Sequence, residues 1–283
     1  MTDVFTLSAF SDEISPDMKE QLYYLNQFGI KYFEIRGVNE KNIADLTLDE
    51  ARKVKSLADG YGIQVSSIGS PIGKIKITDP FEPHLELLAH IISLAKLFET
   101  DYIRVFSFFI PQGEDPAKYK DEVIRRMKAM TALAEKEDMI LLHENEKEIY
   151  GDTAPRCKEI LDAVHSPNLR AVFDPANFVE CGQETYPAAY ELLKDDVVYI
   201  HIKDALAHGK IVPAGMGNGH VEELLRAFEQ KGYRGFLSIE PHLGQFDGLS
   251  ALQSDTSVVN EDRSGPDTFK IAYDALVKIL NKI

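Results

Sequence analysis

Four side chains that can bind a divalent metal ion lie at the ends of four successive hydrophobic runs. They are Glu144, Asp174, His201 and Glu240, in the runs MILLHE, LRAVFD, VVYIHIK and GFLSIE. Short runs rich in Val, Ile, Leu and Phe are typical of buried parallel strands, whose C-terminal ends carry the functional residues of an α/β barrel. The spacings of 30, 27 and 39 residues suit one strand–helix unit between neighbours. This regularity predicts one shared site at one end of a barrel.

Three carboxylates and one imidazole form an oxygen-rich donor set. Such a set favours Mn²⁺, with Mg²⁺, Co²⁺ and Zn²⁺ as further candidates. One carboxylate at a strand end is usually a helix cap or a surface ion pair. Several acids that converge at a barrel mouth would repel one another without a cation, so their joint occurrence favours a metal site. Glu34 and His242 occupy comparable strand-end positions.

Two basic residues near these runs are candidate substrate contacts. Lys203 follows His201 by two positions, so in a strand both side chains face the same way. Its ammonium group could bind a substrate oxygen or stabilise an enolate, or it could neutralise Asp174 or Asp204. Arg104, one strand before the first ligand, could contact a polyol or a phosphate, or it could form a structural salt bridge.

The chain alternates apolar runs with segments of helical periodicity, which predicts a single (β/α)8 TIM barrel domain over residues 1–283. Gly29, Gly62 and Gly232 fall where helices should end, and Thr47 falls where a capping oxygen is useful. Eight strands are predicted, at 5–10, 32–36, 63–69, 102–108, 139–144, 169–174, 197–203 and 235–240.

Two loops of the predicted barrel stand out. Residues 242–267 lack clear periodicity and follow the eighth strand, so we expect a lid or a binding loop over the same rim as the four ligands. The segment PAGMGNGH (213–220) is rich in glycine, and its amides could form an anion nest. It fits neither a Walker nor a dinucleotide pattern, which favours a flexible rim loop and weighs against a nucleotide cofactor.

Composition limits the possible partners. The 46 acidic and 31 basic residues give a net charge of −15, which disfavours binding to nucleic acid or to an anionic membrane. The N-terminal segment has no basic-then-apolar signal, and no apolar stretch reaches spanning length, so we expect a cytoplasmic protein. Cys157 and Cys181 have no metal-type spacing and are expected to be reduced thiols, at least one of them packed in the interior.

Several motifs, in this order and spacing, resemble the xylose isomerase-like TIM barrel superfamily, and within it the sugar phosphate isomerase/epimerase group that includes the ketose 3-epimerases. The resemblance covers nearly the whole chain. The motifs are SAFSDEIS, DPFEPHLELLAHIISLAKLFETDYIRVFSFF, HEN (143–145), FDPAN (173–177), HIKDA (201–205), PAGMGNG and SIEPH.

The resemblance implies that Glu144, Asp174, His201 and Glu240 hold one divalent ion, usually manganese. It also implies that Glu144 and Glu240 act as the acid/base pair, one on each face of a small carbohydrate substrate. Relatives often carry histidine at the position of Asn177, which places Asn177 among the substrate-contacting positions. Similar proteins are often homodimers or homotetramers.

The sequence leaves several reactions open. The leading hypothesis is a metal-dependent isomerase or epimerase that abstracts a proton through an enediolate on a ketose, a sugar phosphate or a related polyol. The alternative is a dehydratase or lyase on a keto-sugar or inosose, which would use the same enolate but expel a β-substituent. An endonuclease would need more metal-binding histidines and a basic groove, and a non-catalytic sugar-binding barrel would not need both Glu144 and Glu240.

Overall fold

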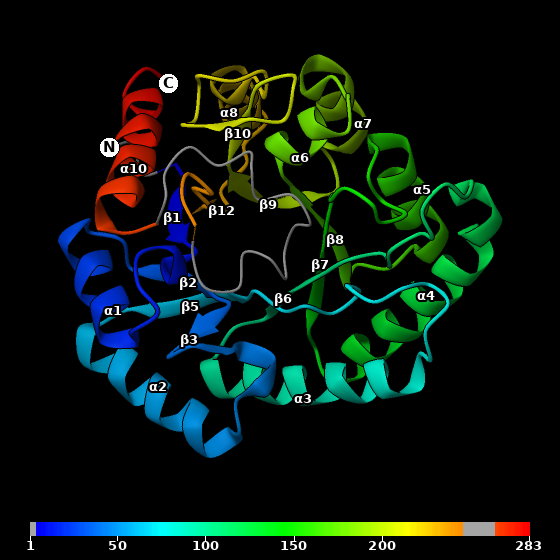
Figure 1. Ribbon diagram of the computed structural model, residues 1–283, viewed down its shortest axis with the longest axis horizontal. Helices are drawn as coiled ribbons and strands as arrows, with labels where there is room; N and C mark the ends of the chain where they lie inside the picture. Colours follow the sequence, from blue (N-terminus) through cyan, green and yellow to red (C-terminus); the bar gives the residue numbers. More distant parts are fainter. Residues whose placement is uncertain (1–3, 246–263) are drawn as a thin grey trace.

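The computed structural model describes residues 4–245 and 264–283, and its centre is a barrel of eight parallel strands. Each of the eight predicted runs contains one strand, which confirms the predicted fold class. The strands are hydrogen-bonded in the order β1-β12-β9-β8-β7-β6-β5-β2, and β1 lies beside β2, so the barrel is nearly closed (Figure 1). Their bounds are β1 Thr6–Ala9, β2 Tyr32–Ile35, β5 Gln64–Ile68, β6 Tyr102–Val105, β7 Ile140–Glu144, β8 Leu169–Phe173, β9 Val197–Ile202 and β12 Phe236–Ile239.

Helices surround the strands (Figure 1). Local signals in the sequence set several of their ends, as expected. Thr47 and Glu50 form a reciprocal capping box at the start of α2, and Gly62 ends that helix in the left-handed region at φ 66°. The helices are α1 Met18–Gln27, α2 Leu48–Tyr61, α3 Glu82–Phe98, α4 Lys120–Lys136, α5 Ala154–Val164, α6 Pro175–Glu180, α7 Tyr190–Leu193, α8 Val221–Gln230 and α10 Pro266–Leu280.

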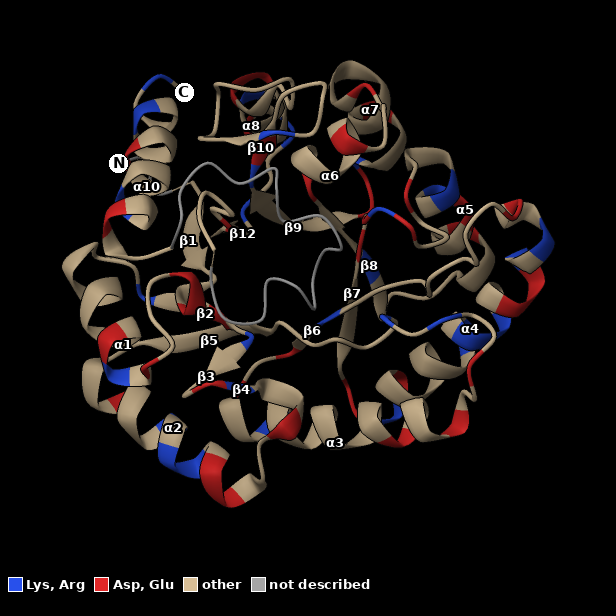
Figure 2. Ribbon diagram, in the orientation of Figure 1, with Lys and Arg blue, Asp and Glu red and all other residues tan. Residues whose placement is uncertain are grey.

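Acidic and basic positions are interspersed over the outer helices (Figure 2). Many of them form pairs within one helix, such as Lys55 with Asp59 in α2, whose closest atoms are 2.9 Å apart. No helix in the described part of the chain is long and apolar enough to cross a membrane. Cys157 is buried, Cys181 is partly buried, and both are free thiols, as expected.

A layer of packed side chains fills the interior of the barrel beneath the C-terminal ends of the strands. Side chains two residues apart in a strand share a face, so Leu142, Val172 and Tyr199, which pack together, lie one layer beneath Glu144, Asp174 and His201. A buried polar network joins this layer, because Ser66 Oγ lies 2.6 Å from Ser8 Oγ and 2.9 Å from the Tyr199 hydroxyl. The strand ends above this layer form the barrel mouth.

Candidate metal centre at the barrel mouth

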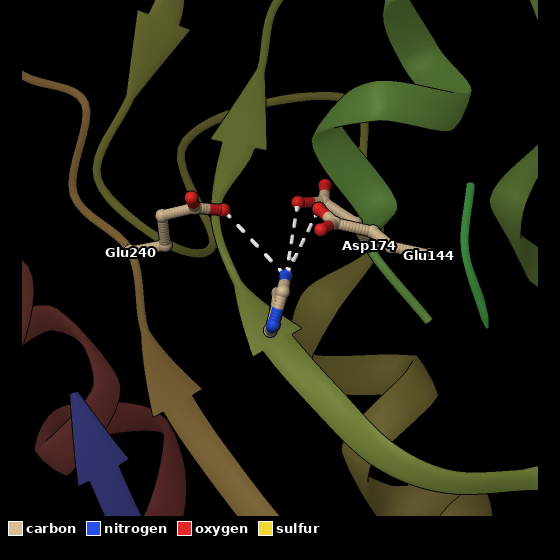
Figure 3. A group of neighbouring side chains, drawn as sticks. Glu144, Asp174 and Glu240 are labelled. Carbon is tan, nitrogen blue, oxygen red and sulfur yellow. Dashed lines mark hydrogen bonds and ion pairs between the residues drawn. The ribbon is translucent and has the colours of Figure 1, made fainter. Parts of the chain in front are cut away.

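The four predicted ligands meet at the barrel mouth. Glu144 is the last residue of β7, Asp174 follows β8 and caps α6, His201 lies near the end of β9, and Glu240 follows β12. All four are buried, and each offers one ligand atom within 4.8 Å of the others. His201 Nδ1 lies 3.1 Å from Glu144 Oε1, 3.6 Å from Glu240 Oε2 and 3.8 Å from Asp174 Oδ2. Figure 3 shows Glu240 on one side of the group and Glu144 with Asp174 on the other.

The donor set fits a divalent cation. Among the described residues, Glu144 Oε2 and Asp174 Oδ2 are buried and accept no hydrogen bond; Arg104 Nη1 lies 3.4 Å from the first and Lys203 Nζ lies 3.0 Å from the second. Buried carboxylate oxygens that accept no hydrogen bond are costly, and a divalent ion would supply positive charge to the three converging carboxylates together. Three oxygen donors and one imidazole suit Mn²⁺ or Mg²⁺. The geometry therefore supports the sequence-based hypothesis of a metal centre.

The pKa values of two of these carboxyls move in opposite directions. Burial raises the pKa of Asp174 to about 7, although Lys203 opposes the change. Burial also acts to raise the pKa of Glu144, but His201 and Arg104 outweigh it and the pKa falls to about 2. Protons and a cation therefore compete most directly at Asp174, because ligands must be deprotonated to bind.

Glu34 of β2 supports the imidazole from the other side. His201 Nε2 lies 3.1 Å from Glu34 Oε2, and both side chains are fully buried. A histidine that binds a metal through one ring nitrogen commonly donates its other N–H to a carboxylate, which fixes its tautomer and orientation. The ladder between β2 and β5 shifts register between Phe33 and Glu34, and such irregularities re-aim side chains next to active sites. Glu34 is therefore placed to orient the His201 ring toward the other three candidate ligands.

The three predicted substrate-contacting residues also lie at this cluster. Lys203 Nζ is 3.0 Å from Asp174 Oδ2 and 3.1 Å from Glu240 Oε2, so among described residues it pairs with Asp174 rather than with Asp204. Arg104 Nη1 is 3.4 Å from Glu144 Oε2. Its Nε is buried and has no hydrogen-bond partner in the described part of the chain.

Asn177 and Asn145 connect the ends of β7 and β8. Asn177 Nδ2 donates to Glu144 Oε1 at 3.3 Å and to the Asn145 carbonyl at 2.9 Å. The Asn145 side chain bridges the strand ends, because its Nδ2 donates to the Asp174 carbonyl and its Oδ1 accepts from the Asp174 amide, both at 2.9 Å. These bonds hold Glu144 and Asp174 in register.

Sequence reasoning missed Arg36, which directly contacts a candidate ligand. Arg36 Nη1 donates to Glu240 Oε1 at 2.9 Å, and the side chain is 4% exposed. A signal was present, because Arg36 lies two positions after Glu34 at the end of the same strand and so faces the same way. An arginine at a strand end is nevertheless too common to be selected without the fold.

The glycine-rich segment 213–220 is an anion nest, but its anion belongs to the protein. The Asp204 carboxylate accepts hydrogen bonds of 2.8–2.9 Å from the amides of Ala205, Gly215, Gly217 and Gly219. These bonds connect the predicted rim loop to Asp204, which directly follows the end of the β9 run. Of the lid or binding loop predicted at 242–267, residues 246–263 lie outside the described residues.

Comparisons with known proteins agree with this fold. The family model of the xylose isomerase-like TIM barrel matches residues 22–258. A curated relative, 3-dehydroshikimate dehydratase from Bacillus anthracis, is 21% identical over 176 residues, which span 62% of this chain and 62% of that protein.

Two solved structures show how closely the backbone follows the family. A D-tagatose 3-epimerase-like protein superposes with a TM-score of 0.77 at 16% identity, covering 98% of each chain. A xylose isomerase-like TIM barrel protein from Mycobacterium smegmatis, in complex with magnesium, superposes with a TM-score of 0.67 at 18% identity, covering 93% of this chain and 89% of that one. At these identities the likeness establishes the fold alone.

Proposed function

The chain belongs to the xylose isomerase-like TIM barrel family, and on that premise we propose that it is a metal-dependent isomerase or epimerase of a ketose, a sugar phosphate or a related polyol. One observation carries the proposal, which is the convergence of Glu144, Asp174, His201 and Glu240 within 4.8 Å at the barrel mouth. Glu144 and Glu240 approach this point from opposite sides (Figure 3). A sugar carbon between them would present one face to each carboxylate.

The four converging side chains are the proposed ligands of one divalent ion. When bound, that ion would polarise the substrate carbonyl and make the neighbouring C–H more acidic. Manganese is our first candidate because of the donor set, and the magnesium complex of the mycobacterial neighbour makes Mg²⁺ the second.

The proton transfers are assigned to the two glutamates. Glu144 Oε2, which accepts no hydrogen bond in the described part of the chain and lies 3.4 Å from Arg104 Nη1, is the atom that takes the proton from the substrate carbon. Glu240, which takes up a proton from solvent before each turnover, returns that proton on the opposite face and thereby inverts the centre. If one glutamate removed the proton and returned it on the same face to the neighbouring carbon of the enediol, while a hydroxyl proton moved to the former carbonyl oxygen, the result would be aldose–ketose isomerisation.

Three neighbouring side chains would orient the substrate. The Lys203 ammonium, between Asp174 and Glu240, can donate to a sugar oxygen and stabilise developing negative charge. Arg104 offers the unpaired Nε donor described above. Asn177 holds Glu144 through its side-chain amide and thereby aims the proposed base.

A dehydratase is the second candidate, and it is favoured by the similarity to 3-dehydroshikimate dehydratase. Such a reaction would begin with the same proton abstraction by Glu144. It would then expel a β-hydroxyl, to which the Lys203–Glu240 pair, whose closest atoms are 3.1 Å apart, would deliver a proton. The two reactions therefore differ in whether a group leaves the substrate.

One experiment separates these candidates. The Mn²⁺-loaded protein is incubated in D₂O with ketoses, sugar phosphates, inososes and 3-keto-glycosides, and the products are followed by NMR. An isomerase or epimerase incorporates deuterium at one carbon and releases nothing, whereas a dehydratase forms a new double bond. If no substrate class showed either deuterium exchange or a new double bond, both candidates would be contradicted.

Variants of the two glutamates test their assigned roles. Glu144→Gln and Glu240→Gln should each lower deuterium incorporation at least 100-fold, because a general acid or base contributes about 10²–10⁴-fold. Glu86→Gln, a change at an exposed residue of α3, is the matched control and should exchange normally. Near-normal exchange in either active-site variant would remove that residue from the mechanism.

A further inference from the structure

A second cluster of ligand-type side chains lies beside the first and shares Glu240 with it. Glu13, Glu240 and His242 are all buried, and each offers a ligand atom within 4.8 Å of the others. Asp12 joins this group through Arg36, which pairs with both Asp12 and Glu13. With Asp12 included, the second cluster contains two glutamates, one aspartate and one histidine, which is the same composition as the first.

A cation of the protein already lies inside this second cluster. Arg36 donates to Asp12 through Nε at 2.7 Å and through Nη2 at 3.0 Å. Its Nη2 also donates to Glu13 Oε1 at 3.2 Å, and its Nη1 donates to Glu240 Oε1 at 2.9 Å. His242 Nε2 lies 3.3 Å from the same Glu240 oxygen and 3.5 Å from Glu13 Oε1. The guanidinium therefore contacts the three acidic members of the cluster directly.

We propose that Arg36 takes the place of a second divalent cation, and that it thereby restricts the barrel mouth to one metal ion. The inference deepens the proposed function, because it rests on metal binding by the first cluster. A buried carboxylate group needs a nearby positive charge, and a guanidinium meets this need with directed hydrogen bonds. A metal ion among the same oxygens would lie in direct repulsion with Arg36, so the cluster can hold one or the other.

The shared residue shows how the two cations divide the site. Glu240 Oε1 is bound by Arg36, whereas Glu240 Oε2 faces the first cluster, 3.1 Å from Lys203 Nζ and 3.6 Å from His201 Nδ1. A carboxylate between two cations presents one oxygen to each. Arg36 is thus a positioning residue that turns Oε2 toward the metal cluster, and Asp12, which contacts two guanidinium nitrogens, holds Arg36 in that orientation.

Removal of the guanidinium should open the second cluster to a metal ion. Arg36→Met removes the charge but keeps an unbranched side chain, so it should bind one equivalent of Mn²⁺ more than the wild type. Equilibrium dialysis with elemental analysis measures the stoichiometry. Electron paramagnetic resonance reports whether the two Mn²⁺ ions are spin-coupled, as two ions sharing one carboxylate should be.

Two further variants make the result specific. Arg36→Lys keeps a cation in the cluster and should retain the wild-type stoichiometry. The double variant Arg36→Met/His242→Ala removes one donor of the second cluster and should lose the additional equivalent. Circular dichroism and thermal unfolding establish that each variant is folded.

The proposal is overturned if folded Arg36→Met binds no more Mn²⁺ than the wild type. If Arg36→Met does not fold, the Mn²⁺ stoichiometry of the wild type tests the proposal. The wild type should then be saturated by Mn²⁺ without any ion in the second cluster. A second wild-type equivalent that disappears in His242→Ala would contradict the proposal. A wild type that binds no Mn²⁺ would contradict the proposed function instead. The difference of one Mn²⁺ equivalent between Arg36→Met and the wild type would still test the role of Arg36.

Discussion

His201 Nε2 lies 3.1 Å from Glu34 Oε2 in the interior of the barrel, although 167 residues separate the two along the chain. Both side chains are fully buried. The contact leaves His201 Nδ1 facing the other candidate ligands. It therefore decides which ring nitrogen is available to a metal ion.

Loss of the Glu34 charge should weaken metal binding without unfolding the protein. Glu34→Gln keeps a hydrogen-bonding side chain of the same shape but makes the imidazole a weaker ligand, and such changes commonly cost about 10–100-fold in metal affinity. Isothermal titration with Mn²⁺ measures the effect, with Glu86→Gln as the exposed control. Unchanged affinity in Glu34→Gln would show that the contact has no role in metal binding.

Removal of the metal should destabilise the protein as well as inactivate it. A ligand present at about 100 times its Kd stabilises the folded state by about 2.7 kcal/mol, so Mn²⁺ should raise the Tm of EDTA-treated protein by about 5 °C. Differential scanning calorimetry tests this expectation, and Mn²⁺ or Co²⁺ should restore activity. In Asp174→Asn, which lacks one proposed ligand, most of the shift should be absent. Full activity in metal-free protein would exclude the proposed mechanism.

The loop around Asp204 should be intolerant of a single added methyl group. A Cβ at Gly217 would lie 2.2 Å from Asp204 Oδ1 and 2.5 Å from the Ala205 carbonyl oxygen. We expect Gly217→Ala to destabilise the protein by on the order of 2 kcal/mol in urea unfolding. Gly60→Ala is the control. Gly60 lies in α2, and a Cβ added there would have no neighbouring atom within 4 Å. This variant should stabilise the protein by about 0.5–1 kcal/mol. Equal stability of the two variants would contradict the role of the nest.

His84 should make the protein less stable in mild acid. Its Nε2 accepts a hydrogen bond from the Gly73 amide at 2.6 Å, and burial, with Arg126 as a second cause, lowers its pKa from 6.5 to about 4. Between these values the unfolded chain binds a proton that the folded protein does not. The free energy of unfolding is therefore not reduced by this group above pH 6.5. It decreases as the pH falls from 6.5 toward 4, by at most about 3 kcal/mol.

The variant His84→Gln separates this effect from general acid sensitivity. Glutamine can accept the same amide hydrogen bond but does not titrate. The free energy of unfolding of His84→Gln should fall less than that of the wild type between pH 7 and pH 5, as measured by urea titration. His208→Gln, at an exposed loop position, should follow the wild-type curve. Parallel curves for wild type and His84→Gln would show that another group titrates.

The sequence alone determined the barrel and placed its eight strands, although β6 ends at Val105, three residues before the predicted end. Each strand is a short buried run whose apolar residues have no alternative but the interior, and glycines and capping residues such as Thr47 mark the helix ends. The C-terminal ends of parallel strands necessarily converge in a closed barrel. For this reason the sequence alone predicts that Glu144, Asp174, His201 and Glu240 lie at one site.

Only the tertiary structure decided what surrounds that site. Arg36 and Glu240 are 204 residues apart and yet hydrogen-bonded, and neither residue type nor spacing predicts this contact, because it depends on how β1 and β2 complete the barrel beside β12. The glycine-rich segment illustrates the same limit, since its pattern indicated an anion nest but could not reveal that Asp204 fills it. Strand periodicity predicts which face of a strand a side chain lies on. The residue with which that side chain forms an ion pair depends on which strands the closed barrel brings together.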